Sequence, residues 1–133
     1  LESELSDEKQ IYISTGLGGK GEKLRFYVLI LANELKPFLE YQKKVIEREF
    51  PYFLEKADCE IERLTIGEKH VELVFLIPVR TDIKQTLDKV INECNQYGNF
   101  LSQVFTITNV KELSAEEVEE IIKKNGGNSQ ASH

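Results

Sequence analysis

The stretch Leu24-Arg-Phe-Tyr-Val-Leu-Ile-Leu-Ala32 decides the fold of this chain. After Arg25 it is an unbroken apolar run, with hydrophobic side chains at both odd and even positions. A strand of this composition has both of its faces covered by other elements. We therefore predict that residues 24–32 form the central strand of one sheet, around which the rest of the chain packs.

A helix through the same region is the alternative, because Leu24, Val28 and Leu31 recur at helical spacing. Pro37 argues against it, since a proline inside a helix costs about 3 kcal/mol. At the first helical position the missing N–H of proline costs little. The sequence therefore favours a strand over 24–32 and a helix that starts near Pro37 and runs to about Phe50, where Pro51 ends or kinks it.

Apolar periodicity outlines the remaining elements. It predicts strands over 59–66, 70–77 and 101–110, a helix capped by Thr81 that stops at Gly98, and a last helix that opens with the capping box Ser114 to Glu117 and ends at 125–127. A change of phase near Glu62 predicts a β-bulge. We expect an α+β fold, a ferredoxin-like βαββαβ sandwich with an extra N-terminal strand over 11–15 and an appended C-terminal helix.

Length and composition set the broad class. The 133 residues suit one domain, which we expect over 11–124, with a disordered acidic tail at 1–10 and a disordered C-terminal tail at 125–133. The net charge of −6 disfavours nucleic-acid binding by bulk electrostatics. No apolar run reaches the roughly 20 residues of a membrane-spanning helix, and the start lacks a signal-peptide pattern, so we expect a cytoplasmic location and no membrane partner. Cys59 and Cys94 match no metal spacing and are predicted to be buried thiols.

A glycine-rich loop at 16–23 is the best candidate ligand site. Its glycines let backbone amides approach an anion, and its lysines add positive charge. A nucleotide-binding P-loop would require a following helix and a Gly-Lys-Ser/Thr ending, whereas Glu22 follows Gly21 here. A flexible hairpin loop is the plainer interpretation. The predicted ligand-binding residues are Gly18, Gly19, Lys20, Gly21, Lys23 and His70.

No catalytic constellation stands out. His70 is the only histidine in the predicted folded region, and no Ser or Cys lies at a spacing that would make it a nucleophile's partner. Glu60, Glu62 and Glu72 fit the exposed face of a hairpin better than a pair of acid–base carboxylates. The sequence predicts no catalytic residue, no metal and no cofactor.

Sheet aromatics offer a third possibility, binding of single-stranded RNA. Phe26, Tyr27 and Phe75, with Arg25 nearby, would have to lie on the open face. Their apolar surroundings predict core positions instead, and the acidic balance makes nucleic acid an unfavoured partner.

These observations lead to a functional prediction by exclusion. We expect a non-catalytic association module, a homo-oligomer or a domain that docks on another protein through its open sheet face or an edge strand. The alternative is a small-ligand or phosphate-binding domain, including an enzyme, that uses the glycine-rich loop.

Overall fold

The computed structural model describes residues 10–12, 22–109 and 111–131. Within them, antiparallel strands form one sheet in the order β1-β3-β4-β2-β5. The strands are β1 (Gln10–Tyr12), β2 (Lys23–Ala32), β3 (Glu60–Ile66), β4 (His70–Pro78) and β5 (Leu101–Thr108). The helices are η1 (Asn33–Leu35), α2 (Glu40–Lys56), α3 (Ile83–Cys94), η2 (Asn95–Tyr97) and α4 (Ala115–Ala131). The predicted α+β class is confirmed.

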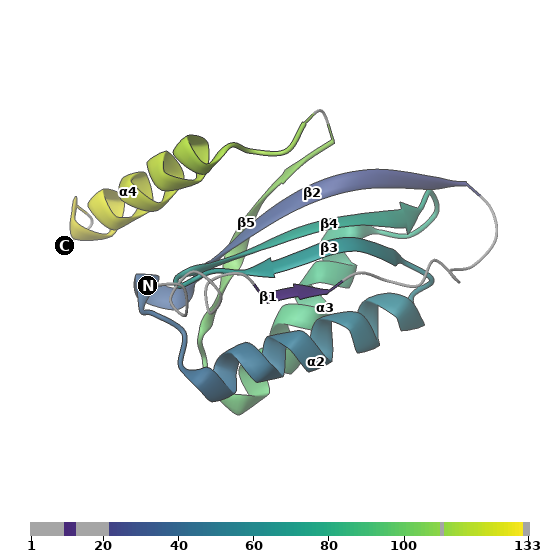
Figure 1. Ribbon diagram of the computed structural model, residues 1–133, viewed down its shortest axis with the longest axis horizontal. Coiled ribbons are helices and arrows are strands. Elements are labelled where there is room, and N and C mark those ends of the chain that lie inside the picture. Colours follow the sequence, from purple (N-terminus) through teal and green to yellow (C-terminus); the bar gives the residue numbers. More distant parts are fainter. Residues whose placement is uncertain (1–9, 13–21, 110, 132–133) are drawn as a thin grey trace.

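Two layers of helix enclose the sheet. Helices α2 and α3 cover one face, and α4 lies over the opposite face (Figure 1). Strand β2 contributes apolar side chains to both faces of the sheet, because successive side chains of a strand point to opposite faces. Val28 and Ile30 belong to the main core beneath α2 and α3, whereas Tyr27, Leu29 and Leu31 belong to a smaller cluster on the α4 side. The prediction that Phe75 lies in the core is confirmed, since its side chain is fully buried.

Several local predictions are also confirmed. The register of β3 on β4 shifts between Ile61 and Arg63, where the bulge was expected. The capping box at the start of α4 contains both of its reciprocal hydrogen bonds between Ser114 and Glu117. The Glu117 amide donates to Ser114 Oγ at 3.1 Å, and the Ser114 amide donates to Glu117 Oε1 at 2.8 Å.

Helix α2 was placed wrongly at both ends. It starts at Glu40, after an extended segment that contains Pro37, and Gln42 caps it by accepting a hydrogen bond from the Leu39 amide at 2.8 Å. It continues through Pro51 to Lys56. The proline is itself buried between the core residues Phe50 and Leu54, so apolar packing offsets the lost backbone hydrogen bond.

Smaller corrections concern helix ends and the first strand. The N-cap of α3 is Asp82 and not Thr81, since the Asp82 carboxylate accepts from the Gln85 amide at 3.1 Å. Helix α4 passes the predicted stop at 125–127 and ends at Ala131, because glycines permit a helix to end without forcing it to. Strand β1 spans Gln10–Tyr12, and the rest of the predicted 11–15 strand lies outside the described residues. Within the described residues, no helix is both long and apolar enough to cross a bilayer.

Asn95 fixes the connection between α3 and β5. Its side-chain oxygen accepts from the amides of Phe100 and Leu101 at 3.2 and 3.0 Å, and its side-chain nitrogen donates to the Leu101 carbonyl at 3.0 Å. Gly98, between them, has a φ of 135°, which favours glycine. One side chain therefore fixes the loop that leads from α3 into β5.

We predict that Asn95→Ala lowers the free energy of unfolding by about 1–3 kcal/mol, because two partly buried amides lose their acceptor. Urea denaturation followed by circular dichroism measures this loss. Gln96→Ala is the matched control, since Gln96 is exposed and makes only a 3.5 Å contact within the helix. Equal stability of the two variants would contradict the role given to Asn95.

Candidate functional site under helix α4

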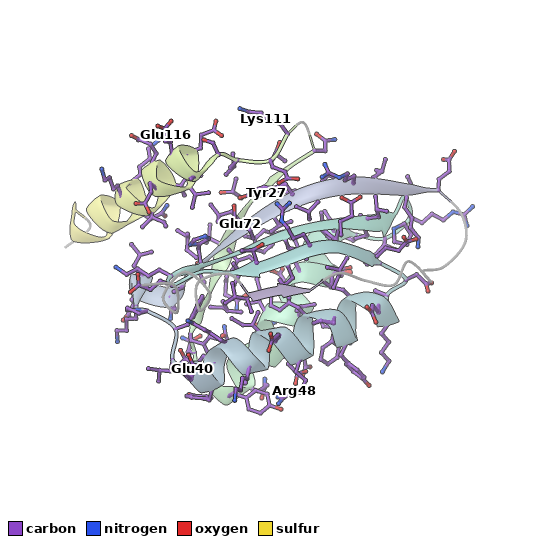
Figure 2. All side chains as sticks on the ribbon, viewed as in Figure 1. Tyr27, Glu40, Arg48, Glu72, Lys111 and Glu116 are labelled. Atoms are coloured by element: carbon purple, nitrogen blue, oxygen red, sulfur yellow. The ribbon has the colours of Figure 1, made fainter. Side chains whose placement is uncertain are left out.

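On the face of the sheet toward α4, polar side chains of β4 lie beside the apolar cluster of β2. On β4, His70 and Glu72 have the same parity as the apolar Val74, so all three point toward α4. Tyr27 comes from the neighbouring β2, where Val74 is its cross-strand partner. Figure 2 shows Tyr27 and Glu72 side by side on the sheet beneath α4.

The Glu72 carboxylate links the other two groups. Its Oε2 accepts a hydrogen bond from the Tyr27 hydroxyl at 2.5 Å, and its Oε1 lies 3.8 Å from His70 Nε2. The Tyr27 side chain is only 2% exposed, whereas the side chains of His70 and Glu72 are 22% and 20% exposed. The buried tyrosine therefore fixes one carboxylate oxygen, and the other oxygen faces an imidazole that solvent reaches.

The surroundings set the charge of this cluster. Burial alone would raise the pKa of Glu72, but the hydrogen bond from Tyr27, the nearby imidazole of His70 and the positive charge of Arg63 outweigh it, so the net shift is downward. Burial, and then the hydrogen bond to Glu72, raise the pKa of Tyr27. Glu72 is thus an anion at neutral pH and Tyr27 a neutral hydrogen-bond donor.

A cavity of about 620 Å³ opens beside the cluster, between the sheet and α4. Its sheet side carries Arg63, Lys69, His70 and Glu72, and its α4 side carries apolar residues such as Val118 together with carboxylates. Val118, Ile121 and Ile122 of α4 pack on the smaller hydrophobic cluster. The cavity therefore lies where α4 packs on the apolar side chains of β2 and leaves His70 and Glu72 on β4, opposite Leu31 and Leu29, accessible.

The hairpin turn at 67–69 holds His70 in place. The Gly67 amide donates to the His70 carbonyl at 2.8 Å, and the imidazole lies against the Gly67 backbone. A Cβ at position 67 would lie only 2.8 Å from His70 Nδ1. Glycine at this position leaves room for the His70 ring and so sets its direction.

Two arginines and one carboxylate close the site near the start of α4. Glu112 Oε2 accepts from Arg25 Nη2 at 2.9 Å, and Glu112 Oε1 accepts from Arg63 Nη2. Hydrogen bonds from Arg63 are the main reason why the pKa of Glu112 is lowered, and Arg25 adds to the effect. Arg25 also bonds Glu62 at 2.8 Å, so Glu62 is paired, as Glu60 is by Lys23 at 2.9 Å.

The structure separates the predicted ligand-binding residues that it describes. Lys23 pairs with Pro78 and Leu31 pairs with His70 in the β2–β4 register, so Lys23 and His70 lie at opposite ends of the strand pair. Gly18, Gly19, Lys20 and Gly21 lie outside the described residues. Anion binding by the glycine-rich loop therefore stays a prediction.

Sequence reasoning placed Tyr27 in the core and Glu72 on a solvated face, and it gave Arg63 and Glu112 no role. One signal was present. On the strongly apolar β4, His70 and Glu72 are polar residues of one parity, so one end of the open face had to be polar. The apolar stripe of α4 was visible in the sequence, but which element covers this face depends on tertiary structure.

Comparison with known proteins gives structural likeness only. No protein-family model and no curated protein sequence matches the chain. A Deinococcus radiodurans R1 protein assigned as a transposase superimposes with a TM-score of 0.66 at 11% identity, over 80% of this chain and 93% of that one. A REP-associated tyrosine transposase bound to a REP hairpin gives a TM-score of 0.56 at 9% identity, over 77% of this chain and 66% of that one. The chain therefore shares its fold with these two structures.

These matches contradict the function predicted from sequence. Transposases are enzymes that handle DNA. By this comparison, it was wrong to predict a non-catalytic association module and to lean against an enzyme. It was also wrong to predict self-association or protein docking and to treat nucleic acid as an unlikely partner. The exclusion of nucleic acid had relied on the net charge, which says nothing about the local distribution of cations.

The structure predicts how Tyr27→Phe changes stability with pH. A lowered pKa of Glu72 stabilises the fold above the unfolded value of about 4.3, and this contribution is lost as pH falls through the folded pKa. Tyr27→Phe removes one cause of the lowering. The difference in unfolding free energy between wild type and variant should therefore be larger at pH 7 than at pH 3, as measured by urea denaturation.

Tyr41→Phe is the control for that experiment. Its hydroxyl donates to the backbone carbonyl of Tyr97 at 3.1 Å, which does not titrate in this range. The loss of unfolding free energy caused by Tyr41→Phe should be the same at pH 7 and at pH 3. A pH-independent cost for Tyr27→Phe as well would show that Tyr27 does not influence Glu72.

Gly67→Ala should move the His70 ring and leave the fold intact. The added methyl group displaces the imidazole from its position beside Glu72. We expect changed imidazole resonances of His70 in NMR spectra with an unchanged far-ultraviolet circular dichroism spectrum. Lys69→Ala, in the same turn, should leave the imidazole resonances nearly unchanged, and an unmoved His70 in Gly67→Ala would contradict the packing described.

Proposed function

We propose that this chain is a DNA-handling domain that binds DNA at the cavity under α4 and acts on its phosphodiester backbone. The observation that carries the proposal is the His70–Glu72–Tyr27 cluster, of which His70 and Glu72 line that cavity beside Arg63 and Lys69. The likeness to two transposase structures supports DNA as the class of substrate.

The finer fold assignment belongs to the same proposal. The strand order β3-β4-β2-β5, with α2 connecting β2 to β3 and α3 connecting β4 to β5, supports a ferredoxin-like sandwich extended by β1 and α4. The single domain over 11–124 and the cytoplasmic location are likewise kept as proposals.

Binding would depend on a few local cations. Arg63 and Lys69 lie on one side of the cavity, which the carboxylates of Glu68, Glu72, Glu112 and Glu119 also line, in a chain whose net charge is −6. Each phosphate contact contributes about −0.7 to the slope of log affinity against log salt for single strands. Two or three contacts would therefore give a slope of only about −2, far shallower than that of a protein that binds through a large basic surface.

His70 is the group best placed for acid–base chemistry. Glu72 orients and electrostatically supports the imidazole, and Tyr27 in turn holds Glu72. Tyr27 is an unsuitable nucleophile in this arrangement, because it is buried and its pKa is raised. In the proposed reaction, His70 accepts a proton from a water molecule whose oxygen bonds to phosphorus. The P–O bond to one nucleoside then breaks, and the leaving oxygen takes a proton from solvent.

The test is cleavage and binding of a fluorescently labelled DNA hairpin that carries a single-stranded tail. Wild type should bind the hairpin and cleave it, and His70→Gln should bind normally but cleave at least about 100-fold more slowly. His133→Gln removes the other histidine of the chain and is the matched control, with wild-type activity expected. Reactions with Mg²⁺, with Mn²⁺ and with EDTA reveal whether a cation joins Glu72 and a DNA phosphate, which are both suitable ligands.

Two outcomes would contradict the proposal. Wild-type protein that neither binds nor cleaves the hairpin under any of these conditions would exclude the DNA-handling function. Cleavage by His70→Gln at the wild-type rate would retain DNA as the substrate and remove the assigned role of His70.

A further inference from the structure

We propose that Arg25 and Arg63 form a binding site for one phosphate group of the DNA backbone, and that Glu112 occupies this site while α4 lies over the sheet. The inference rests on the proposed function and deepens it, because it names the contact that admits the substrate.

The geometry is that of a shared anion site. Arg25 comes from β2 and Arg63 from β3, with β4 between these strands, yet both guanidinium groups reach the same carboxylate. Each arginine binds a different oxygen of Glu112. The two cations therefore converge on a group that carries one negative charge on two oxygens.

A phosphodiester presents the same features. It also carries one negative charge, shared by two non-bridging oxygens, and the guanidinium fork binds carboxylates and phosphates alike. Arg25 keeps its Nε contact with Glu62, which fixes the direction of its Nη atoms without occupying the one that reaches Glu112. A DNA phosphate can therefore replace Glu112 without rebuilding the site.

The contacts of Glu112 are also exchangeable. The side chains of Arg25, Arg63 and Glu112 are 48%, 38% and 33% exposed. Ion pairs this open to water are weak, because solvent screens them. A polyanion that offers several phosphates at once competes well against a single carboxylate.

The position of Glu112 connects the exchange to the catalytic cavity. Glu112 precedes the first residue of α4, Ala115, and it lines the cavity together with Arg63 and His70. Beyond it, α4 is held on the sheet by a narrow apolar contact around Val118. Release of Glu112 therefore leaves the start of α4 with its apolar contacts, among them that of Leu113, and loosens the helix over His70 and Glu72.

The experiment compares Glu112→Gln with Glu120→Gln. Each variant removes one negative charge, and Glu120 is exposed on α4 away from both arginines. Fluorescence anisotropy with the labelled hairpin should show that Glu112→Gln binds roughly fivefold tighter or more than Glu120→Gln, as expected for two competing ligands. Hydrogen exchange of the α4 amides should be faster in Glu112→Gln without DNA, and in wild type only when DNA is added.

The possible outcomes separate this inference from the proposed function. If wild type binds the hairpin and both variants bind equally, the inference is overturned and the DNA-handling function stands. If no protein binds the hairpin, the DNA-handling function fails and inorganic tripolyphosphate becomes the probe. Tripolyphosphate should then speed hydrogen exchange of the α4 amides in wild type, and the double variant Arg25→Gln and Arg63→Gln should abolish this effect. Both results together would support the anion site. No change of exchange in wild type would overturn it.

Discussion

The constraint on which this structure depends is that β2 is apolar on both faces. Val28 and Ile30 require cover on one side, and Leu29 and Leu31 require it on the other. Burial of such residues contributes roughly 1.5–3 kcal/mol per side chain, so neither face is stable in contact with water. Helices α2 and α3 cover the first face, and α4 is the element that the second face requires (Figure 1).

The candidate site follows from how α4 meets that requirement. Its short apolar stripe, Val118 to Ile122, covers only the end of the face where the smaller hydrophobic cluster lies. Opposite Leu31 and Leu29 of this cluster, His70 and Glu72 on β4 open into the cavity. Tyr27 belongs to both parts, because its ring packs in the cluster while its hydroxyl fixes Glu72. The same strand thus anchors the covering helix and the polar site.

The sequence predicted the elements better than the site. Two-sided hydrophobicity identified β2, a phase change located the bulge near Arg63, and the Ser114–Glu117 spacing predicted the start of α4. These signals are local, so they can be read along the chain. The sequence left open whether Pro51 ends or kinks α2, and the packing of Phe50 and Leu54 decides for a helix that continues through it.

The site lacked such local signals. Tyr27 and Glu72 are far apart in the sequence and meet only through the β2–β4 register, and Glu112 reaches Arg63 only after α4 is placed. Composition carried no information about the site either, because a net charge of −6 does not tell that Arg63 and Lys69 meet carboxylates at one cavity. Chemistry that depends on register and on a covering helix becomes visible only in three dimensions.

The most direct test of the central claim is an NMR titration of isotopically labelled wild-type protein with the unlabelled DNA hairpin. The account predicts that the resonances of Arg63, Lys69, His70 and the first turns of α4 shift, while those of the outward face of α2, on the other side of the sheet, stay in place. Shifts confined to α2 and α3, with the resonances around His70 unchanged, would show that DNA binds elsewhere and would contradict the account.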